Sequence, residues 1–119
     1  MTVWSWLAIA LAGGVGAVAR FVVDGAVGAR FGARFPLGTL VINLSGSFML
    51  GLLTGLELST EALLIAGTAA IGSYTTFSTW MLDSDRLRRS GAPAAAALNV
   101  VVSVVLGVAL AALGRTLGR

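Results

Sequence analysis

The sequence contains no cysteine, no histidine and no lysine, and it carries only 8 arginines and 5 acidic residues among 119 residues. Without cysteine there is no disulfide framework and no thiol chemistry. Without histidine the chain lacks the commonest general base and the commonest ligand of transition metals. A chain that is 57% hydrophobic and 11% charged also has too little charge to cover the surface of a soluble domain.

The few charged residues are segregated, and they leave four uncharged runs: Met1–Ala19, Phe35–Leu56, Ala62–Leu82 and Ser90–Gly114. Because an α-helix rises about 1.5 Å per residue, roughly 20 residues cross the hydrocarbon core of a bilayer. The pattern predicts an all-α membrane protein with four transmembrane helices in a single domain, residues 1–119. The first run has no basic segment before it, so we expect it to be retained as a span rather than cleaved as a signal peptide.

The net charge of +3 does not indicate a nucleic-acid partner. We interpret the arginines, which flank the apolar runs, as anchors at the membrane interface. Arg20 is expected to end the first helix, Val3–Ala19, either as an interfacial anchor or as a basic residue at the mouth of an anion path. The segment Phe21–Phe35 contains a tandem Gly-Ala-Arg-Phe repeat and is predicted to form a short interfacial turn with Arg30 and Arg34 on one face.

The remaining boundaries follow from local signals. Pro36 is expected at the start of the second helix, where its missing amide hydrogen does no harm. Ser59 or Thr60 is expected to cap the third helix. Asp85 and Arg89 are spaced to form a pair on a helical extension of the third segment, and Pro93 is expected to restart the chain as the fourth helix.

Two predicted helices carry matching stripes of polar and small residues at four-residue spacing. The second helix has Asn43, Ser47, Gly51 and Gly55, and the fourth has Asn99, Ser103, Gly107 and Ala111. An amide in hydrocarbon needs partners. Asn43 therefore serves either interhelical hydrogen bonding or an aqueous, ion-bearing path, and the sequence leaves both open.

The third run contains the most unusual stretch, Gly72-Ser73-Tyr74-Thr75-Thr76-Phe77-Ser78-Thr79-Trp80. Glycine and threonine are poor helix formers, and this stretch lies near the middle of the run. Within a membrane, a broken helix is tolerated only where its freed backbone groups find protein, water or an ion. The sequence predicts that the third helix is broken at mid-membrane, where membrane proteins often handle ions.

The uncharged runs offer no carboxylate, histidine, cysteine or lysine, so no enzyme site and no proton-coupled carrier can be built from them. What remains are hydroxyls, amides, backbone ends and aromatic edges, which can solvate a small ion without holding it too tightly to leave. The donors Asn43, Thr76, Ser78, Thr79, Asn99 and Ser103, with the positive ring edge of Phe77, favour an anion. Freed carbonyls at the break would favour a small cation instead.

With these motifs together, the sequence resembles the Fluc (CrcB) family of microbial fluoride channels over essentially its whole length. The resemblance is carried by Gly13-Gly14-x-Gly16-Ala17-x-x-Arg20, by Gly38-Thr39-Leu40-x-x-Asn43-x-x-Gly46-Ser47-Phe48, and most specifically by Gly72-x-x-Thr75-Thr76-Phe77-Ser78-Thr79.

The resemblance implies a fluoride-selective channel that exports fluoride passively through two pores of an antiparallel, dual-topology dimer. It implies a central structural sodium ion (Na+) held by the backbone carbonyls of Gly72 and Thr75 from both protomers. It assigns to the fluoride pore Asn43, Thr76, Phe77, Thr79 and Ser103, to the vestibule Arg20, and to the pore mouth Asp83. It places the chain in the plasma membrane of a bacterium or archaeon, the inner membrane if the cell is Gram-negative.

Trp80 departs from the family pattern, which usually has a second phenylalanine three residues after the first. Its indole is larger and brings an N–H donor, so it would either bond fluoride directly or narrow the pore. We include Trp80 among the expected pore residues.

The arginine distribution bears on the partner of this chain. Six arginines lie in or before the first and third loops, and two lie near the carboxyl terminus. The positive-inside rule would place those two loops in the cytoplasm. A dimer of opposed protomers needs little bias, so the partner is a second copy of this chain or an oppositely biased homologue; we favour the homodimer.

The competing hypotheses are a small four-helix multidrug-type transporter, whose first-span glutamate is missing here, and a membrane assembly subunit without transport of its own.

Overall fold

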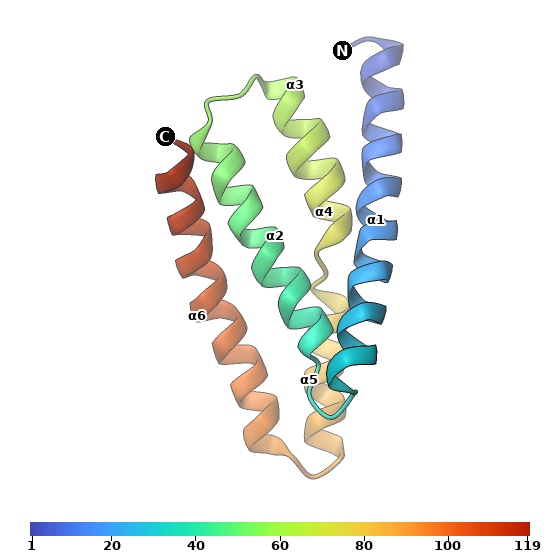
Figure 1. Cartoon of the computed structure of the whole chain (residues 1–119), viewed down its shortest axis with the longest axis vertical. Coiled ribbons are helices and arrows are strands. Elements are labelled where there is room, and N and C mark those ends of the chain that lie inside the picture. The colour runs from blue at the N-terminus through green and yellow to red at the C-terminus, as the bar shows by residue number, and fades with distance from the viewer.

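The computed structural model describes residues 1–119 as helices joined by short connections, without strands. Three long helices are α1 (Val3–Phe31), α2 (Leu37–Gly55) and α6 (Pro93–Gly118). Between α2 and α6 the chain forms a broken path made of α3 (Thr60–Ala62), the π-helix η1 (Leu63–Ile71), α4 (Gly72–Tyr74) and α5 (Ser78–Arg89). The bundle measures 51 × 28 × 22 Å, with both termini and the α2–α3 loop at one end (Figure 1).

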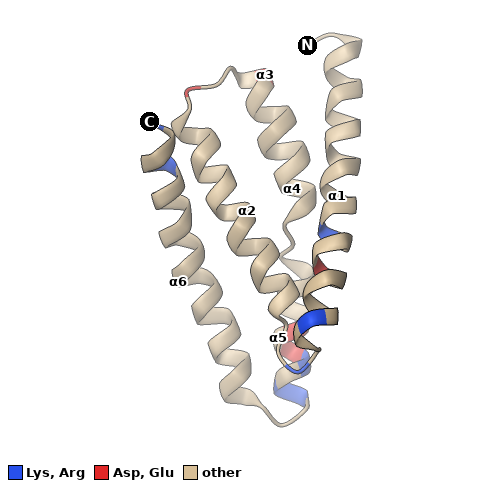
Figure 2. Cartoon of the chain, viewed as in Figure 1, with Lys and Arg blue, Asp and Glu red and all other residues tan.

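The three long helices are long and apolar enough to cross a membrane. They confirm three of the predicted membrane helices, and the chain is a multi-pass membrane protein. Most charged residues lie toward the two ends, α1 also carries a basic and an acidic residue partway along its length, and the long middle stretches of α2 and α6 carry none (Figure 2). The expected third span, Ala62–Leu82, is interrupted, so its crossing of the membrane stays a prediction.

The expected end of the first helix at Arg20 is wrong, because α1 continues without interruption to Phe31. No proline and no positive backbone angle interrupts the chain between these residues, so hydrogen bonding propagates past the arginine. The helix ends at Gly32, which has a φ of 78° and donates its amide hydrogen to the Gly28 carbonyl at 2.8 Å. The predicted interfacial turn is therefore split: Arg30 lies in the last helical turn, and Arg34 lies in the loop, not on the same helical face.

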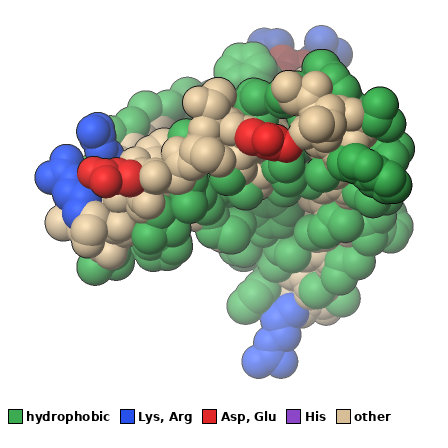
Figure 3. Space-filling view, turned by 90° about the horizontal axis from the view of Figure 1, so that it is seen from above, with side chains coloured by type: hydrophobic (Ala, Val, Ile, Leu, Met, Phe, Trp, Pro, Cys, Tyr) green, Lys and Arg blue, Asp and Glu red, His purple; other side chains and the backbone are tan.

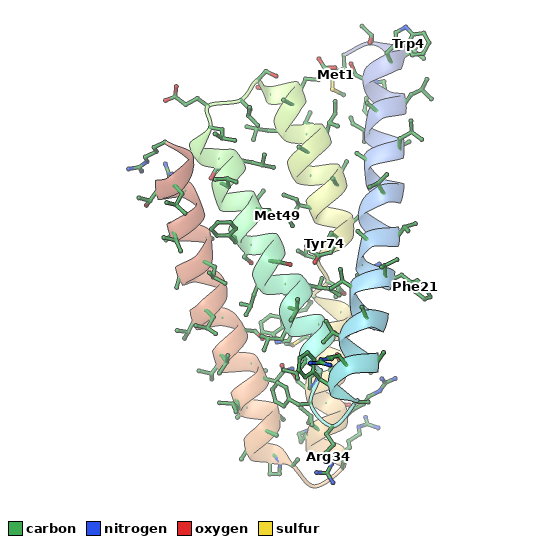
Figure 4. The ribbon with its side chains drawn as sticks, in the orientation of Figure 1. Met1, Trp4, Phe21, Arg34, Met49 and Tyr74 are labelled. Atoms are coloured by element: carbon green, nitrogen blue, oxygen red, sulfur yellow. The ribbon has the colours of Figure 1, made fainter.

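Most of the surface is apolar, and only 17 of 119 residues are buried within the chain (Figure 3). Trp4 and Phe21 are 78% and 81% exposed, and their rings project outward from α1 (Figure 4). Continuous apolar surface of this kind is stable only against lipid or another protein. The surface therefore agrees with a chain whose solvent is a membrane.

Small residues bring the helices close together. A Cβ atom added at Gly51 would overlap the backbone of Ala111 on α6, and one added at Gly114 would overlap the backbone of Phe48 on α2. On the other side of the bundle, Gly16 of α1 lies directly against Ala70 of η1. In a membrane, such close backbone approach replaces the hydrophobic drive between helices.

Three predicted signals at the other helix ends are confirmed, and α2 begins at Leu37, directly after Pro36. Ser59 caps the third segment, since its hydroxyl accepts from the Ala62 amide at 3.2 Å. Asp85 pairs with Arg89 at 2.8 Å on a helix that extends to that residue. Pro93 is the first residue of α6.

Candidate functional site

The break in the third segment lies at Thr75, whose backbone is extended, with φ −82° and ψ 162°. The amide and the hydroxyl of Thr75 both donate to the Ile71 carbonyl, at 2.9 and 3.1 Å. The chain returns to helical geometry at Phe77, ahead of α5. The prediction of a helix broken within Gly72–Trp80 is confirmed, and the interruption falls between Tyr74 and Ser78.

Asn43 of α2 pairs with the backbone at this break through both halves of its amide. The Asn43 Oδ1 accepts from the Thr76 amide at 2.9 Å, and the Asn43 Nδ2 donates to the Thr76 carbonyl at 2.9 Å. Of the two roles left open by the sequence, interhelical hydrogen bonding is therefore present in the structure. The same residue also lines the main pocket, described below.

The backbone carbonyls of Gly72 and Thr75 are among those at the break that lose their usual helical partners. In a continuous helix the Gly72 carbonyl would accept from the Thr76 amide, but that amide bonds to Asn43. The Thr75 carbonyl accepts no hydrogen bond from backbone or side chain. Unpaired carbonyl oxygens are the ligand type that fits a small hard cation.

An open pocket of about 640 Å³ lies between α2, the broken segment and α6. It brings together seven of the residues that the sequence analysis assigned to the site: Asn43, Gly72, Thr75, Thr76, Phe77, Trp80 and Ser103. The Ser103 hydroxyl is buried and has no hydrogen-bond partner. The pocket is otherwise lined mostly by small and apolar residues, so its few polar groups determine what it can hold.

Three expected site residues, Thr79, Asp83 and Arg20, lie outside this pocket. Thr79 lines a second pocket of about 480 Å³ near the α1–α2 loop, together with Asp83 and Arg86. Arg20 lies half-buried on α1 and makes no ion pair or hydrogen bond. The structure of this chain therefore does not join these three residues to the central group.

Trp80 packs beside Phe77, with ring centroids 5.8 Å apart in an edge-to-face arrangement. Its indole N–H donates to the Asn99 carbonyl of α6 at 3.3 Å. The N–H that the sequence suggested as a direct fluoride donor is thus already bonded within the chain. The Phe77 ring is 70% exposed and faces the open pocket.

Several polar contacts between helices were not predicted from the sequence, including two that involve Asp83 and Ser84 of α5. The Thr39 hydroxyl of α2 donates to Asp83 at 3.0 Å, and the Asn99 Nδ2 donates to the Ser84 hydroxyl at 2.9 Å. A signal for Thr39 was present, because it continues the four-residue spacing of Asn43 and Ser47 by one turn. Ser84 carried no comparable signal.

Asp85, which lies outside the apolar runs and near the end of α5, has a lowered pKa. The hydrogen bond from Arg88 holds the pKa of Asp85 below its ordinary value of 3.8, and the charge of Arg89 acts in the same direction. The carboxylate is ionised at neutral pH and anchors the basic last turn of the helix.

Comparison with known proteins decides the family. Residues 7–115 match the protein family described as "CrcB-like protein, Camphor Resistance (CrcB)". The chain belongs to the CrcB family. It is 59% identical over 118 residues to "Fluoride-specific ion channel FluC 2" of Mycolicibacterium paratuberculosis, covering 99% of this chain and 97% of that relative.

Other relatives are also named as fluoride-specific ion channels. "Fluoride-specific ion channel FluC 2" of Mycobacterium bovis is 48% identical over 119 residues, covering 100% of this chain and 94% of the relative. "Fluoride-specific ion channel FluC 1" of Symbiobacterium thermophilum is 44% identical over 120 residues, covering 96% and 97%. Because these relatives are named as ion channels, the predictions of the family and of a non-enzymatic protein are confirmed.

Proposed function

We propose that this CrcB protein is a fluoride-selective ion channel that exports fluoride passively across the plasma membrane of a prokaryote. The observation that carries the proposal is the 59% identity, over nearly the full chain, to a relative named as a fluoride-specific channel. The neutral chemistry of the main pocket supports it, because no ionisable side chain lines that pocket.

The hydrogen-bonding pattern selects which groups would meet the anion. The Asn43 amide and the Trp80 N–H are engaged with backbone. The Ser103 hydroxyl has no partner, and the Thr76 Oγ1 accepts from the Thr79 amide at 3.2 Å, which leaves its own hydrogen free. We assign anion contact to Ser103, Thr76 and the exposed ring edge of Phe77. Thr79 and Arg20 remain proposed contacts farther along the path.

The backbone at the break also fits a structural sodium ion. The carbonyl oxygens of Gly72 and Thr75, which have no helical partners, would hold it. These two carbonyls of one protomer are too few to replace the hydration shell of the ion. A second protomer that contributes the same pair would give four ligands and one fixed positive charge at the centre of the assembly.

The shortage of sodium ligands in one chain supports a dimer as the functional unit. The pocket that holds the candidate residues is open on one side, and Phe77 and Gly72 are exposed there. We propose that a second copy in the opposite orientation covers this face. The broken segment, third in chain order, would then complete the set of four membrane spans. A two-fold axis in the membrane plane would then repeat the path on the other side.

Fluoride efflux from proteoliposomes tests the function. Vesicles loaded with potassium fluoride, driven by a potassium gradient with valinomycin, should release fluoride to an ion-selective electrode well above empty vesicles. Vesicles loaded with potassium chloride should retain chloride. No fluoride release above the protein-free control would refute the channel, and equal release of both anions would refute its selectivity.

Two substitutions test the proposed path. In Asn43→Asp, an anion at about 4 Å from the new carboxylate meets a repulsion of roughly 4 kcal/mol at an effective dielectric constant of about 20, so flux should fall by about three orders of magnitude. Phe77→Ile removes the positive ring edge and should abolish flux. Both variants should elute as the same dimer as the unaltered protein; normal conduction by both would show that the path lies elsewhere.

A further inference from the structure

We propose that Asn43 is a positioning residue that keeps the third segment broken and thereby leaves the Gly72 carbonyl free for a cation. The inference deepens the proposed function and rests on its sodium site. It assigns to Asn43 a role that is separate from contact with the anion.

At the break, one hydrogen bond of the Thr76 amide is exchanged for another. In a continuous helix, the Thr76 amide would donate to Gly72 four residues before it. In this structure that amide donates to the Asn43 Oδ1 at 2.9 Å, and the Thr76 carbonyl accepts from the Asn43 Nδ2 at 2.9 Å. A single side chain satisfies both backbone groups of Thr76, so the break costs no unpaired group at that residue.

The same turn of α2 also contacts the residues on the amino-terminal side of the break. The methyl group of Thr75 lies over Gly46, where an added Cβ would overlap it. The Ser45 hydroxyl bonds to the Tyr74 hydroxyl at 2.9 Å (Tyr74 in Figure 4). Residues 43–46 therefore hold residues 74–76 in place, and only Asn43 does so through the backbone.

Removing the side-chain amide of Asn43 is expected to close the break. An apolar side chain at position 43 leaves the Thr76 N–H without its partner in apolar surroundings, where an unpaired amide is strongly disfavoured. The helical acceptor closest in sequence is the Gly72 carbonyl. The segment is then expected to relax toward a continuous helix, and the oxygen that is proposed to hold sodium becomes occupied.

Three variants separate the roles of the side chain. Asn43→Leu keeps the branched shape of the side chain and removes both hydrogen bonds. Asn43→Asp keeps an acceptor for the Thr76 N–H, so it should keep the break although it blocks flux. Ser47→Ala is the matched control, because Ser47 lies one turn farther along the same face of α2, lines the same pocket and makes no hydrogen bond through its side chain.

Backbone ¹³C chemical shifts of threonine-labelled protein give the first readout, which depends on neither ion. The Thr75 resonances should lie in the extended range in the unaltered protein, in Asn43→Asp and in Ser47→Ala, and should move to the helical range in Asn43→Leu. Should Asn43→Leu not fold, Asn43→Ala replaces it. Retention of extended shifts in the apolar variant, or their loss in Asn43→Asp, overturns the positioning role.

Stabilisation by sodium gives the second readout. A cation that binds only the folded state stabilises it by RT ln(1 + c/Kd) at cation concentration c, so the unfolding temperature rises with that concentration. Replacing N-methylglucamine chloride with sodium chloride should raise the unfolding temperature of the unaltered protein, of Ser47→Ala and of Asn43→Asp. The sodium-dependent rise should be lost in Asn43→Leu.

The outcomes distinguish this inference from the proposed function. Absence of sodium stabilisation in the unaltered protein refutes the sodium site, while the chemical shifts still decide whether Asn43 holds the break. An undiminished sodium response in Asn43→Leu refutes the link between Asn43 and Gly72. Fluoride flux in the unaltered protein is measured separately and decides the channel itself.

Discussion

Asn99 and Ser103 lie one helical turn apart on α6, yet their polar groups are in opposite situations. Asn99 is 1% exposed and joins α6 to α5: its Nδ2 donates to the Ser84 hydroxyl, which donates in turn to the Trp80 carbonyl at 2.9 Å. The Ser103 hydroxyl is buried beside the main pocket and bonds to nothing. A buried donor without a partner lowers stability, so its presence points to a role other than packing.

The two residues should therefore respond in opposite ways to substitution by alanine. Ser103→Ala should leave the free energy of unfolding unchanged or raise it by up to about 1 kcal/mol, and should lower fluoride flux. Asn99→Ala should lower the free energy of unfolding by about 2 kcal/mol, since the Ser84 hydroxyl loses its donor and the missing amide leaves a cavity. Unfolding in detergent and flux in proteoliposomes check both. A destabilised Ser103→Ala with normal flux would remove Ser103 from the path.

At the scale of elements, the third segment is irregular on both sides of its break. The π-helix η1 precedes it, and η1 is held against α1 where Gly16 approaches Ala70. π-Helical geometry is rare and is frequent at functional sites. The long helices around it are regular and are fixed by close contact of glycines with neighbouring backbone. Rigid α2 and α6 can therefore hold an irregular segment in one conformation.

This arrangement predicts a sharp difference between two glycines. Gly114→Ala should lower the free energy of unfolding by about 2 kcal/mol, because the new methyl group overlaps the Phe48 backbone and forces α2 and α6 apart. Gly14→Ala, on the open face of α1, meets no atom within 4 Å and should raise helix stability by somewhat less than about 1 kcal/mol.

Thermal unfolding of the two variants in the same detergent checks this difference. The substitution is the same in both, and both glycines lie inside helices, so each variant serves as the control for the other. An equal effect at both positions would show that the α2–α6 contact does not determine the stability of the bundle.

At the scale of the whole molecule, the charges define two unlike ends (Figure 2). The end with the α1–α2 and α5–α6 connections carries Arg30, Arg34, Arg86, Arg88 and Arg89, whereas the end with both termini carries Arg115 and Arg119. Asp85 offsets part of the first cluster through its pairs with Arg88 and Arg89. The positive-inside rule counts arginines rather than net charge, so five arginines against two favour one orientation, and insertion in both directions stays a proposal.

The proposed homodimer predicts that both orientations occur in one membrane. A cysteine added after Arg119, in a chain that has none of its own, should react with an impermeant maleimide from both sides in roughly equal amounts, as opposed insertion requires. An Arg34→Ala, Arg86→Ala double variant is the control and should change that ratio. Labelling from one side alone would exclude the antiparallel homodimer and favour a partner chain of opposite bias.

Several features could be predicted from residue patterns because they depend on neighbours in the chain. The apolar runs, the Ser59 cap, the Asp85–Arg89 pair and the break after Gly72 all follow from local propensity and spacing. The end of α1 could not be predicted in this way, because an arginine permits a helix to end but does not force it to. Of the candidate site, the sequence identified the group around Thr75 and Phe77, but not the contacts of Thr39 and Ser84, which join residues 44 and 15 positions apart in the chain.

By itself the sequence determined that this protein is a helical membrane protein without an enzyme site, because charge and titratable groups are absent from its apolar runs. It also determined where the third segment must break, since glycine and threonine weaken the helix there. Only the tertiary structure decided how the break is held. The Thr76 amide could have bonded to Gly72, to water or to a side chain, and the packing of α2 against the broken segment places Asn43 at 2.9 Å from it.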